Sequence, residues 1–84
     1  ATAELIAANG IGSGNALDTV ISSLAASNTT SGNIGITNVA ALDITTVGGT
    51  NGITNNGGGD INIDNTGALT VSQAVQTTGG NGSI

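Results

Sequence analysis

The side chains of this sequence that could do chemistry are five carboxylates, because the chain has no Lys, Arg, His or Cys. They are Glu4, Asp18, Asp43, Asp60 and Asp64. Asp60 and Asp64 are nearest in sequence, but four residues along a strand separate them by roughly 13 Å. Glycosidase carboxylate pairs lie about 5–9.5 Å apart. Ser and Thr are numerous but have no base to activate them. We therefore expect no catalytic residues, no cofactor and no enzymatic activity.

A calcium site is the other chemistry that carboxylates suggest. Gly57-Gly58-Gly59-Asp60 is similar to the start of the calcium-binding repeat Gly-Gly-x-Gly-x-Asp, but the match fails. Asp60 stands where the fourth residue should be Gly, and Asn62 stands where the Asp should be. The chain has no EF-hand pattern either. We expect no metal site, with a weak calcium contact at Asp60 or Asp64 as the alternative to solvated carboxylates.

The composition excludes several classes of partner. The net charge is −5 and no side chain is cationic, so nothing could neutralise nucleic-acid phosphates. An anionic membrane surface would repel the chain, and no apolar run is long enough to form a membrane-spanning helix. There are no aromatic residues, which disfavours stacking on sugar rings. Thr pairs at 29–30, 45–46 and 77–78 do not recur at one position, which disfavours an ice-binding array.

The elements that position these residues are short strands. In the stretch 59–71, Ile61 and Ile63 form one pair of apolar residues spaced by two, and Leu69 and Val71 form another. A spacing of two places both members of a pair on one face of a strand. Residues 65–68 (Asn-Thr-Gly-Ala) have the composition of a turn. The stretch predicts a strand, a corner and a second strand.

The same stretch also occurs earlier in the chain, at 32–44, and the two copies align without a gap. Ile34, Ile36, Leu42 and Ile44 take the places of the four apolar residues above. Asn28 and Asn55 are also identical in this alignment, as are Asn38 and Asn65. A period in the range of about 20–50 residues indicates a repeat architecture, in which each unit packs on the next. We expect a structural core of stacked residues: Ile34, Ile36, Leu42, Ile44, Ile61, Ile63, Leu69 and Val71.

Weaker copies flank these two. Leu5-x-Ala7-x-Asn9 matches Ile34-x-Ile36-x-Asn38, and Asn81-Gly82-Ser83-Ile84 resembles Gly58–Ile61. Parallel strands about 4.8 Å apart would superpose equivalent residues. We therefore expect an asparagine ladder of Asn9, Asn38 and Asn65, with each amide bonded to the next.

The predicted fold is an all-β solenoid of about three coils of about 27 residues each, in a single domain 1–84. The expected coils span approximately 1–28, 29–55 and 56–84, with three short strands in each. Residues 16–26 allow two interpretations. Leu17, Val20, Ile21 and Leu24 have helical spacing, with Asn15 as a possible N-cap. The repeat alignment favours strands. Disorder is the alternative for so Gly- and Asn-rich a chain, but the regular β-branched residues disfavour it.

The segments Leu5–Gly12, Leu24–Ile36 and Asn65–Val71 together resemble the repeats of bacterial large exoproteins, the filamentous-haemagglutinin-like adhesins. This resemblance covers nearly the whole chain. It implies a right-handed parallel β-helix that is exported to the extracellular space or the bacterial cell surface, with roles in adhesion, biofilm or cell contact. The sequence lacks that family's N-terminal secretion domain and any recognisable binding or toxin module.

Two functions follow as expectations. The first is a structural repeat of a secreted or cell-surface fibre, either an adhesin shaft or a self-associating filament, because neither end carries a convincing polar cap. Its partners would be further copies of itself or flanking repeats, placed end to end. The alternative is an adhesin module that binds a glycan or protein of a host or neighbouring cell. It would use outward strand faces or the loops at 12–16 and 48–52.

Overall fold

The computed structural model describes residues 1–80 and 82–84, which form eleven strands and no helix. The strands are β1 (Thr2–Ala7), β2 (Leu17–Thr19), β3 (Ser23–Asn28), β4 (Gly32–Val39), β5 (Leu42–Ile44), β6 (Thr46–Val47), β7 (Thr50–Asn51), β8 (Ile53–Asn55), β9 (Gly58–Thr66), β10 (Leu69–Val71) and β11 (Val75–Thr77). The all-β expectation is confirmed. Within 16–26, β2 and the start of β3 occupy the region that also had helical spacing.

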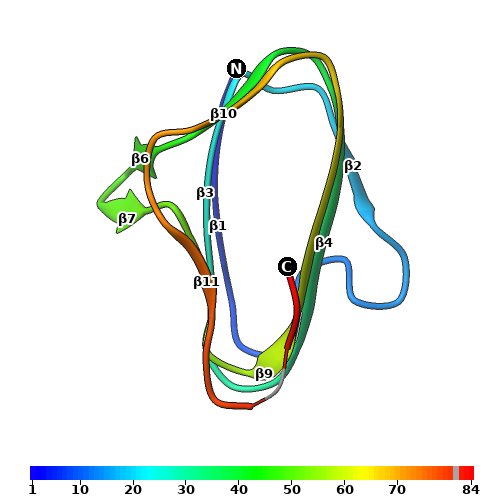
Figure 1. Cartoon of the computed structure of the whole chain (residues 1–84), viewed down its shortest axis with the longest axis vertical. Coiled ribbons are helices and arrows are strands. Elements are labelled where there is room, and N and C mark those ends of the chain that lie inside the picture. The colour runs from blue at the N-terminus through cyan, green and yellow to red at the C-terminus, as the bar shows by residue number, and fades with distance from the viewer. Residues whose placement is uncertain (81) are drawn as a thin grey trace.

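Two parallel sheets contain most of these strands. Sheet A has the order β10-β5-β3-β8-β11 with β1 paired to β3, and sheet B has the order β2-β4-β9. The chain alternates between them, so that each strand pairs with a strand from the preceding or following pass. Figure 1, viewed down the shortest axis, shows β4 and β9 superposed on one side, with β1, β3 and β11 opposite. We call each trip through both sheets a pass.

The register of β4 on β9 follows the sequence repeat. Ile34 pairs with Ile61, Ile36 with Ile63 and Asn38 with Asn65. In sheet A, Leu42 pairs with Leu69 and Ile44 with Val71. All of these pairs have the same separation in sequence. Equivalent side chains therefore lie over one another in neighbouring passes.

A pass is nevertheless shorter than the repeat spacing suggests, which corrects the expected coil length and the expected number of coils. Leu24 pairs with Ile44, and Asp18 pairs with Thr37, so partners in these passes lie closer in sequence than Ile34 and Ile61 do. The longer spacing arises where a pairing spans residues 45–52, which leave the sheet and form an antiparallel hairpin of β6 and β7. As a result, sheet A has four successive layers: β1, β3, β5 with β8, and β10 with β11.

The hairpin lies on the outer face of sheet A (Figure 1). The Thr50 hydroxyl donates a hydrogen bond of 2.6 Å to the Glu4 carboxylate on β1, two layers back. Ala25 of β3, which contacts the hairpin strands, is fully buried although it alternates with the core residues Leu24 and Ala26 and is not part of the core cluster. The hairpin therefore connects the first three layers on the outer face of sheet A, because it follows β5 in the chain and contacts both β3 and β1.

The core is the narrow space between the two sheets. Its buried members are Ile11, Leu24, Ala26, Ile34, Ile36, Leu42, Ile44, Ile53 and Ile61. Ile63 packs against this cluster but is only half-buried. Leu69 and Val71 continue the columns of Leu42 and Ile44 in register, yet they are 46% and 56% exposed. These two expected core residues are thus at the surface, because β10 is a terminal strand of sheet A and no other described strand pairs with its free edge.

The weak N-terminal copy has a different place from the one expected. Leu5 pairs with Ala26 and Ala7 with Asn28, so β1 lies in sheet A and not over β4 in sheet B. The strand that does lie over β4 is β2. The alignment of Leu5 with Ile34 was wrong because Leu-x-Ala-x-Asn matches by residue type alone, whereas the first passes are shorter than that alignment requires.

Candidate functional site

Two asparagines, Asn38 and Asn65, are stacked at the corner where the chain leaves sheet B. Asn38 Nδ2 donates to Asn65 Oδ1 at 2.9 Å. On the other side, Asn38 Oδ1 accepts from the Thr19 hydroxyl at 2.7 Å and from the Ile21 N–H at 2.9 Å. Asn65 Nδ2 donates to the carbonyls of its own corner, Gly67 and Ala68. This ladder has a direction, because the Asn38 amide donates toward the C-terminal layers.

Asn9 does not belong to this ladder. Its side chain is exposed, and its Oδ1 accepts from the Ser31 hydroxyl at 3.2 Å. The residue that lies over Asn38 in the first layer is Thr19. The expectation for Asn9 is wrong because Asn9 follows β1 in sheet A, whereas the ladder begins at the end of β2 in sheet B.

A second asparagine pair, Asn28 and Asn55, lies at the opposite corner and was not predicted. Both side chains are fully buried, and Asn28 Nδ2 donates to Asn55 Oδ1 at 3.0 Å. Asn28 Oδ1 accepts from the Gly10 N–H, and Asn55 Nδ2 donates to the Gly32 carbonyl. The sequence signal was present. Asn28 and Asn55 are identical in the repeat, and each follows an inward apolar residue by two positions.

The Asn38–Asn65 and Asn28–Asn55 pairs leave none of their buried amide groups without a hydrogen-bond partner. Among the residues that the structure describes, every buried side-chain nitrogen or oxygen has a hydrogen-bond partner. Burying an amide without partners costs roughly 1–3 kcal/mol. The corners can therefore be dry and still hold polar residues, provided that each layer has a neighbour to bond.

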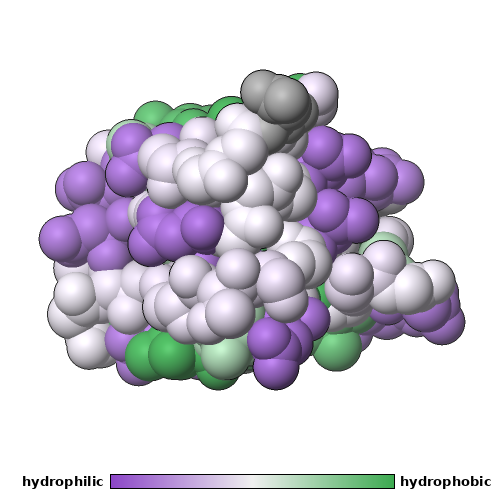
Figure 2. Space-filling view, turned by 90° about the horizontal axis from the view of Figure 1, so that it is seen from below, coloured by the Kyte–Doolittle hydropathy of each residue, from purple (hydrophilic) through white to green (hydrophobic). Residues whose placement is uncertain are grey.

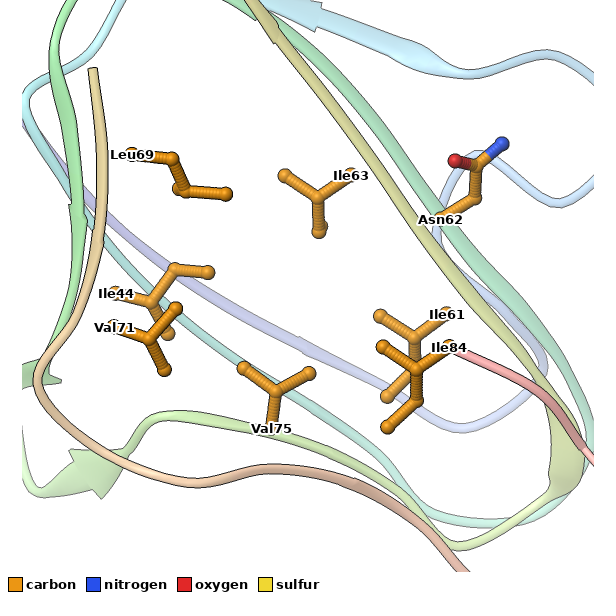
Figure 3. Close-up of a pocket in the computed structure, with 8 residues that line it drawn as sticks. All are labelled: Ile44, Ile61, Asn62, Ile63, Leu69, Val71, Val75 and Ile84. Atoms are coloured by element: carbon orange, nitrogen blue, oxygen red, sulfur yellow. The ribbon is translucent and has the colours of Figure 1, made fainter.

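The C-terminal end of the molecule is open. A hollow of about 500 Å³ lies between β9 and the β10–β11 edge, and Figure 3 shows seven aliphatic side chains directed into it while Asn62 points outward. The aliphatic residues are Ile44, Ile61, Ile63, Leu69, Val71, Val75 and Ile84. Ile84 is 71% exposed. This end presents the interior of the molecule, since the side chains that form the core in other layers lack a covering layer here.

The side of the molecule differs from its ends. Figure 2 shows hydrophobic atoms gathered at the upper and lower edges, which are the two ends of the short axis, with hydrophilic and neutral atoms between them. The strands that border the open end, β10 and β11, are the terminal strands of sheet A. An unpaired strand edge beside an apolar surface is a template for further β-pairing. The open end is therefore the candidate site, and its chemistry is hydrogen-bonding and apolar packing.

The carboxylates lie apart from this end's interior and do not converge. Asp60 accepts a hydrogen bond from the Ser83 N–H at 2.9 Å, and Asp43 accepts from the Ser72 hydroxyl at 2.6 Å. Within residues 1–80 and 82–84, no three His, Cys, Asp or Glu side chains come close enough to hold a metal ion. The same residues contain no helix that could cross a membrane.

A smaller groove of about 240 Å³ lies on the outer face of sheet B, beside the loop at 12–16. Its polar lining comes from that loop and from the two strands beneath it: Ser13, Asn15, Asn33, Asp60 and Asn62. Gly35 allows the loop to lie close, because a Cβ at this position would be 3.0 Å from the Gly12 carbonyl oxygen. The other expected loop, at 48–52, is occupied by its contact with Glu4.

Comparison with protein-family models, curated proteins and solved structures found no match for this chain.

Proposed function

We propose that this chain is a segment of a right-handed parallel β-helix that serves as the structural shaft of an extracellular fibre, and that it has no enzymatic activity. The observation that carries the proposal is the continuity of its interior along one axis. The same columns pass from layer to layer and end at the apolar hollow between β9 and β10. A shaft built in this way lengthens by adding layers, and each layer contacts only its neighbours.

The axial dimension supports this interpretation. The short extent of the molecule is 17 Å, which accommodates four layers at about 4.8 Å with their side chains. The other two extents, 30 and 26 Å, describe a cross-section that added layers would not change. Further copies of the chain, or flanking repeats, are the partners that such a cross-section fits.

The composition and the resemblance to large exoproteins support a location outside the cell or on a bacterial surface. The chain has no Cys or Met to oxidise and no Lys or Arg for a trypsin-like protease to cleave. An antibody raised against the chain should label intact cells of the source organism. Labelling only after lysis would contradict this location.

Duplication of one internal pass tests the structural proposal. Residues 53–74 form a complete pass without the hairpin, since Ile53 pairs with Val75. A second copy inserted after Ala74 should keep the circular-dichroism signature of strands and raise the midpoint of chemical denaturation, because stability in repeat proteins grows with the number of layers. The control inserts a second copy of residues 53–71 at the same place. This copy lacks the corner at 72–74, so the strands after the insertion are displaced from their register. A midpoint that falls equally in both variants would contradict the proposal.

The groove beside the 12–16 loop favours a second candidate function, the binding of a glycan or protein to the side of the shaft. Amide and carboxylate groups are suited to hydrogen-bonding hydroxyl-rich ligands. A glycan array probed with the chain and with Asn62→Ala, whose side chain is exposed, tests this function. Binding that the substitution abolishes would support the second candidate, and the absence of binding in both proteins would remove it.

A further inference from the structure

The open end is not uniformly uncovered, because residues 82–84 already lie on part of β9. The Ile61 N–H donates to the Ser83 carbonyl at 2.8 Å, and the Ser83 N–H donates to the Asp60 carboxylate. Figure 3 shows Ile84 superposed on Ile61. Ile84 therefore occupies, on β9, the position that Ile61 occupies on β4.

The rest of β9 is exposed on this side. In a parallel strand, alternate residues direct their backbone groups to opposite neighbours. Since Ile61 donates toward Ser83, Ile63 and Asn65 direct their N–H groups to the same open side. Beside them lies the apolar hollow. This edge has the hydrogen-bonding groups and the apolar surface that one added strand requires.

We propose that this edge of β9 binds one further parallel strand in line with Ile84, and that this strand is the first element the open end accepts. The inference rests on the proposed function, and it identifies the partner of the open end. The β4–β9 pairing defines the pattern: apolar residues over Ile61 and Ile63, and an amide side chain over Asn65. Ile84 is the first of these apolar residues.

Charge restricts the partner further. On the outer face of sheet B, the register places Thr37 between Asp18 and Asp64. The three layers thus alternate between charged and neutral residues, which keeps the carboxylates from facing one another directly. The strand that binds β9 must therefore be neutral at the position next to Asp64.

The first strand of a second copy does not satisfy this edge. β1 belongs to sheet A, where it pairs with β3, so a copy stacked on β10 and β11 would leave β9 uncovered beyond Ile61. The segment 62–68 separates Ile61 from Leu69, the start of the next strand of sheet A. A strand that binds β9 in line with Ile84 therefore needs a segment of the same length before a strand equivalent to β10 can begin.

The test adds such a segment to the C-terminus of the complete chain. The in-phase extension is Gly-Ile-Thr-Asn-Val-Ala-Ala, copied from residues 35–41. It places Ile over Ile63, Thr beside Asp64 and Asn over Asn65. The matched control, Ile-Gly-Asn-Thr-Val-Ala-Ala, has the same composition but turns Ile and Asn outward. We expect the in-phase extension to slow amide hydrogen exchange at Ile63 and Asn65 about tenfold or more relative to the control.

Equal exchange rates in the two extended chains would overturn the inference. Concentration-dependent protection of the same amides in the unextended chain would overturn it too, because a second copy would then cover β9 directly. That second outcome would leave the proposed shaft intact. Conversely, a denaturation midpoint that falls equally in the duplication variant and its control would reject the proposed shaft. The exchange rates at Ile63 and Asn65 would still show whether the edge of β9 binds a strand.

Discussion

Two regions with the same local pattern have opposite burial. Leu42 and Ile44 in β5 are 2% and 1% exposed, whereas Leu69 and Val71 in β10 are 46% and 56% exposed. The two strands lie side by side in register. Their difference is that β5 has a neighbour on each side, while β10 ends the sheet. In this molecule, burial is therefore decided by the next layer and not by the pattern within a strand.

Matched truncations in one column should have the largest effect and would test this comparison directly. Ile44→Ala should lower the free energy of unfolding by about 2–5 kcal/mol, because it leaves a cavity between two layers. Val71→Ala, directly above, should cost less than about 1 kcal/mol, because its side chain is already largely hydrated. Urea denaturation of both variants measures the difference. Equal losses would show that the last layer is as well covered as the middle one.

The asparagine ladder extends the comparison to polar groups. Asn38→Ala should cost roughly 2–3 kcal/mol, because it leaves the Ile21 N–H and the Asn65 amide oxygen without partners. Asn65→Ala should cost only about 1 kcal/mol, since this side chain is half-buried and its other partners are carbonyls of its own corner. Thermal or chemical denaturation gives both values. Asn9→Ala is the control and should fall within about 0.5 kcal/mol of the original chain.

The hairpin should give the smallest effect. Thr50→Ala removes an exposed hydrogen bond to Glu4 and should cost about 0.5–1 kcal/mol. The loss should be local, with faster amide exchange in β1 and β6 and no change at the open end. Faster exchange in β10 or β11 would contradict the view that the hairpin connects only the first three layers.

Much of the fold could be predicted from the sequence, because equivalent residues of neighbouring layers resemble one another. Ile34 and Ile61 are identical, and so are Asn38 and Asn65. Because residues that stack in β4 and β9 are of the same type at these positions, the register of β4 on β9 could be derived without coordinates.

Other features could not be derived in this way. The length of a pass could not be read from the repeat because residues 45–52 leave the sheet. Such an insertion lengthens the separation in sequence between paired residues without changing the alternation of apolar and polar residues within the strands. Neither Asn9 nor Leu5 could be placed correctly, because the first layers have shorter passes. The exposure of Leu69 and Val71 depends on an absent neighbour, which no local pattern records. The Asn28–Asn55 pair could have been found from its identity in the repeat.

Disulfide trapping gives the most direct test of the stacked register, since the chain has no native Cys. Thr37 and Asp64 are partners on the outer face of sheet B. Neighbouring strands lie about 4.8 Å apart, within the Cα separation of about 4.4–6.8 Å that a disulfide allows. The double variant Thr37→Cys with Asp64→Cys should therefore cross-link rapidly under mild oxidation. Thr37→Cys with Asp60→Cys, which is displaced by roughly 13 Å along the strand, should not. Equal cross-linking of the two pairs, or trapping of the second alone, would contradict the account.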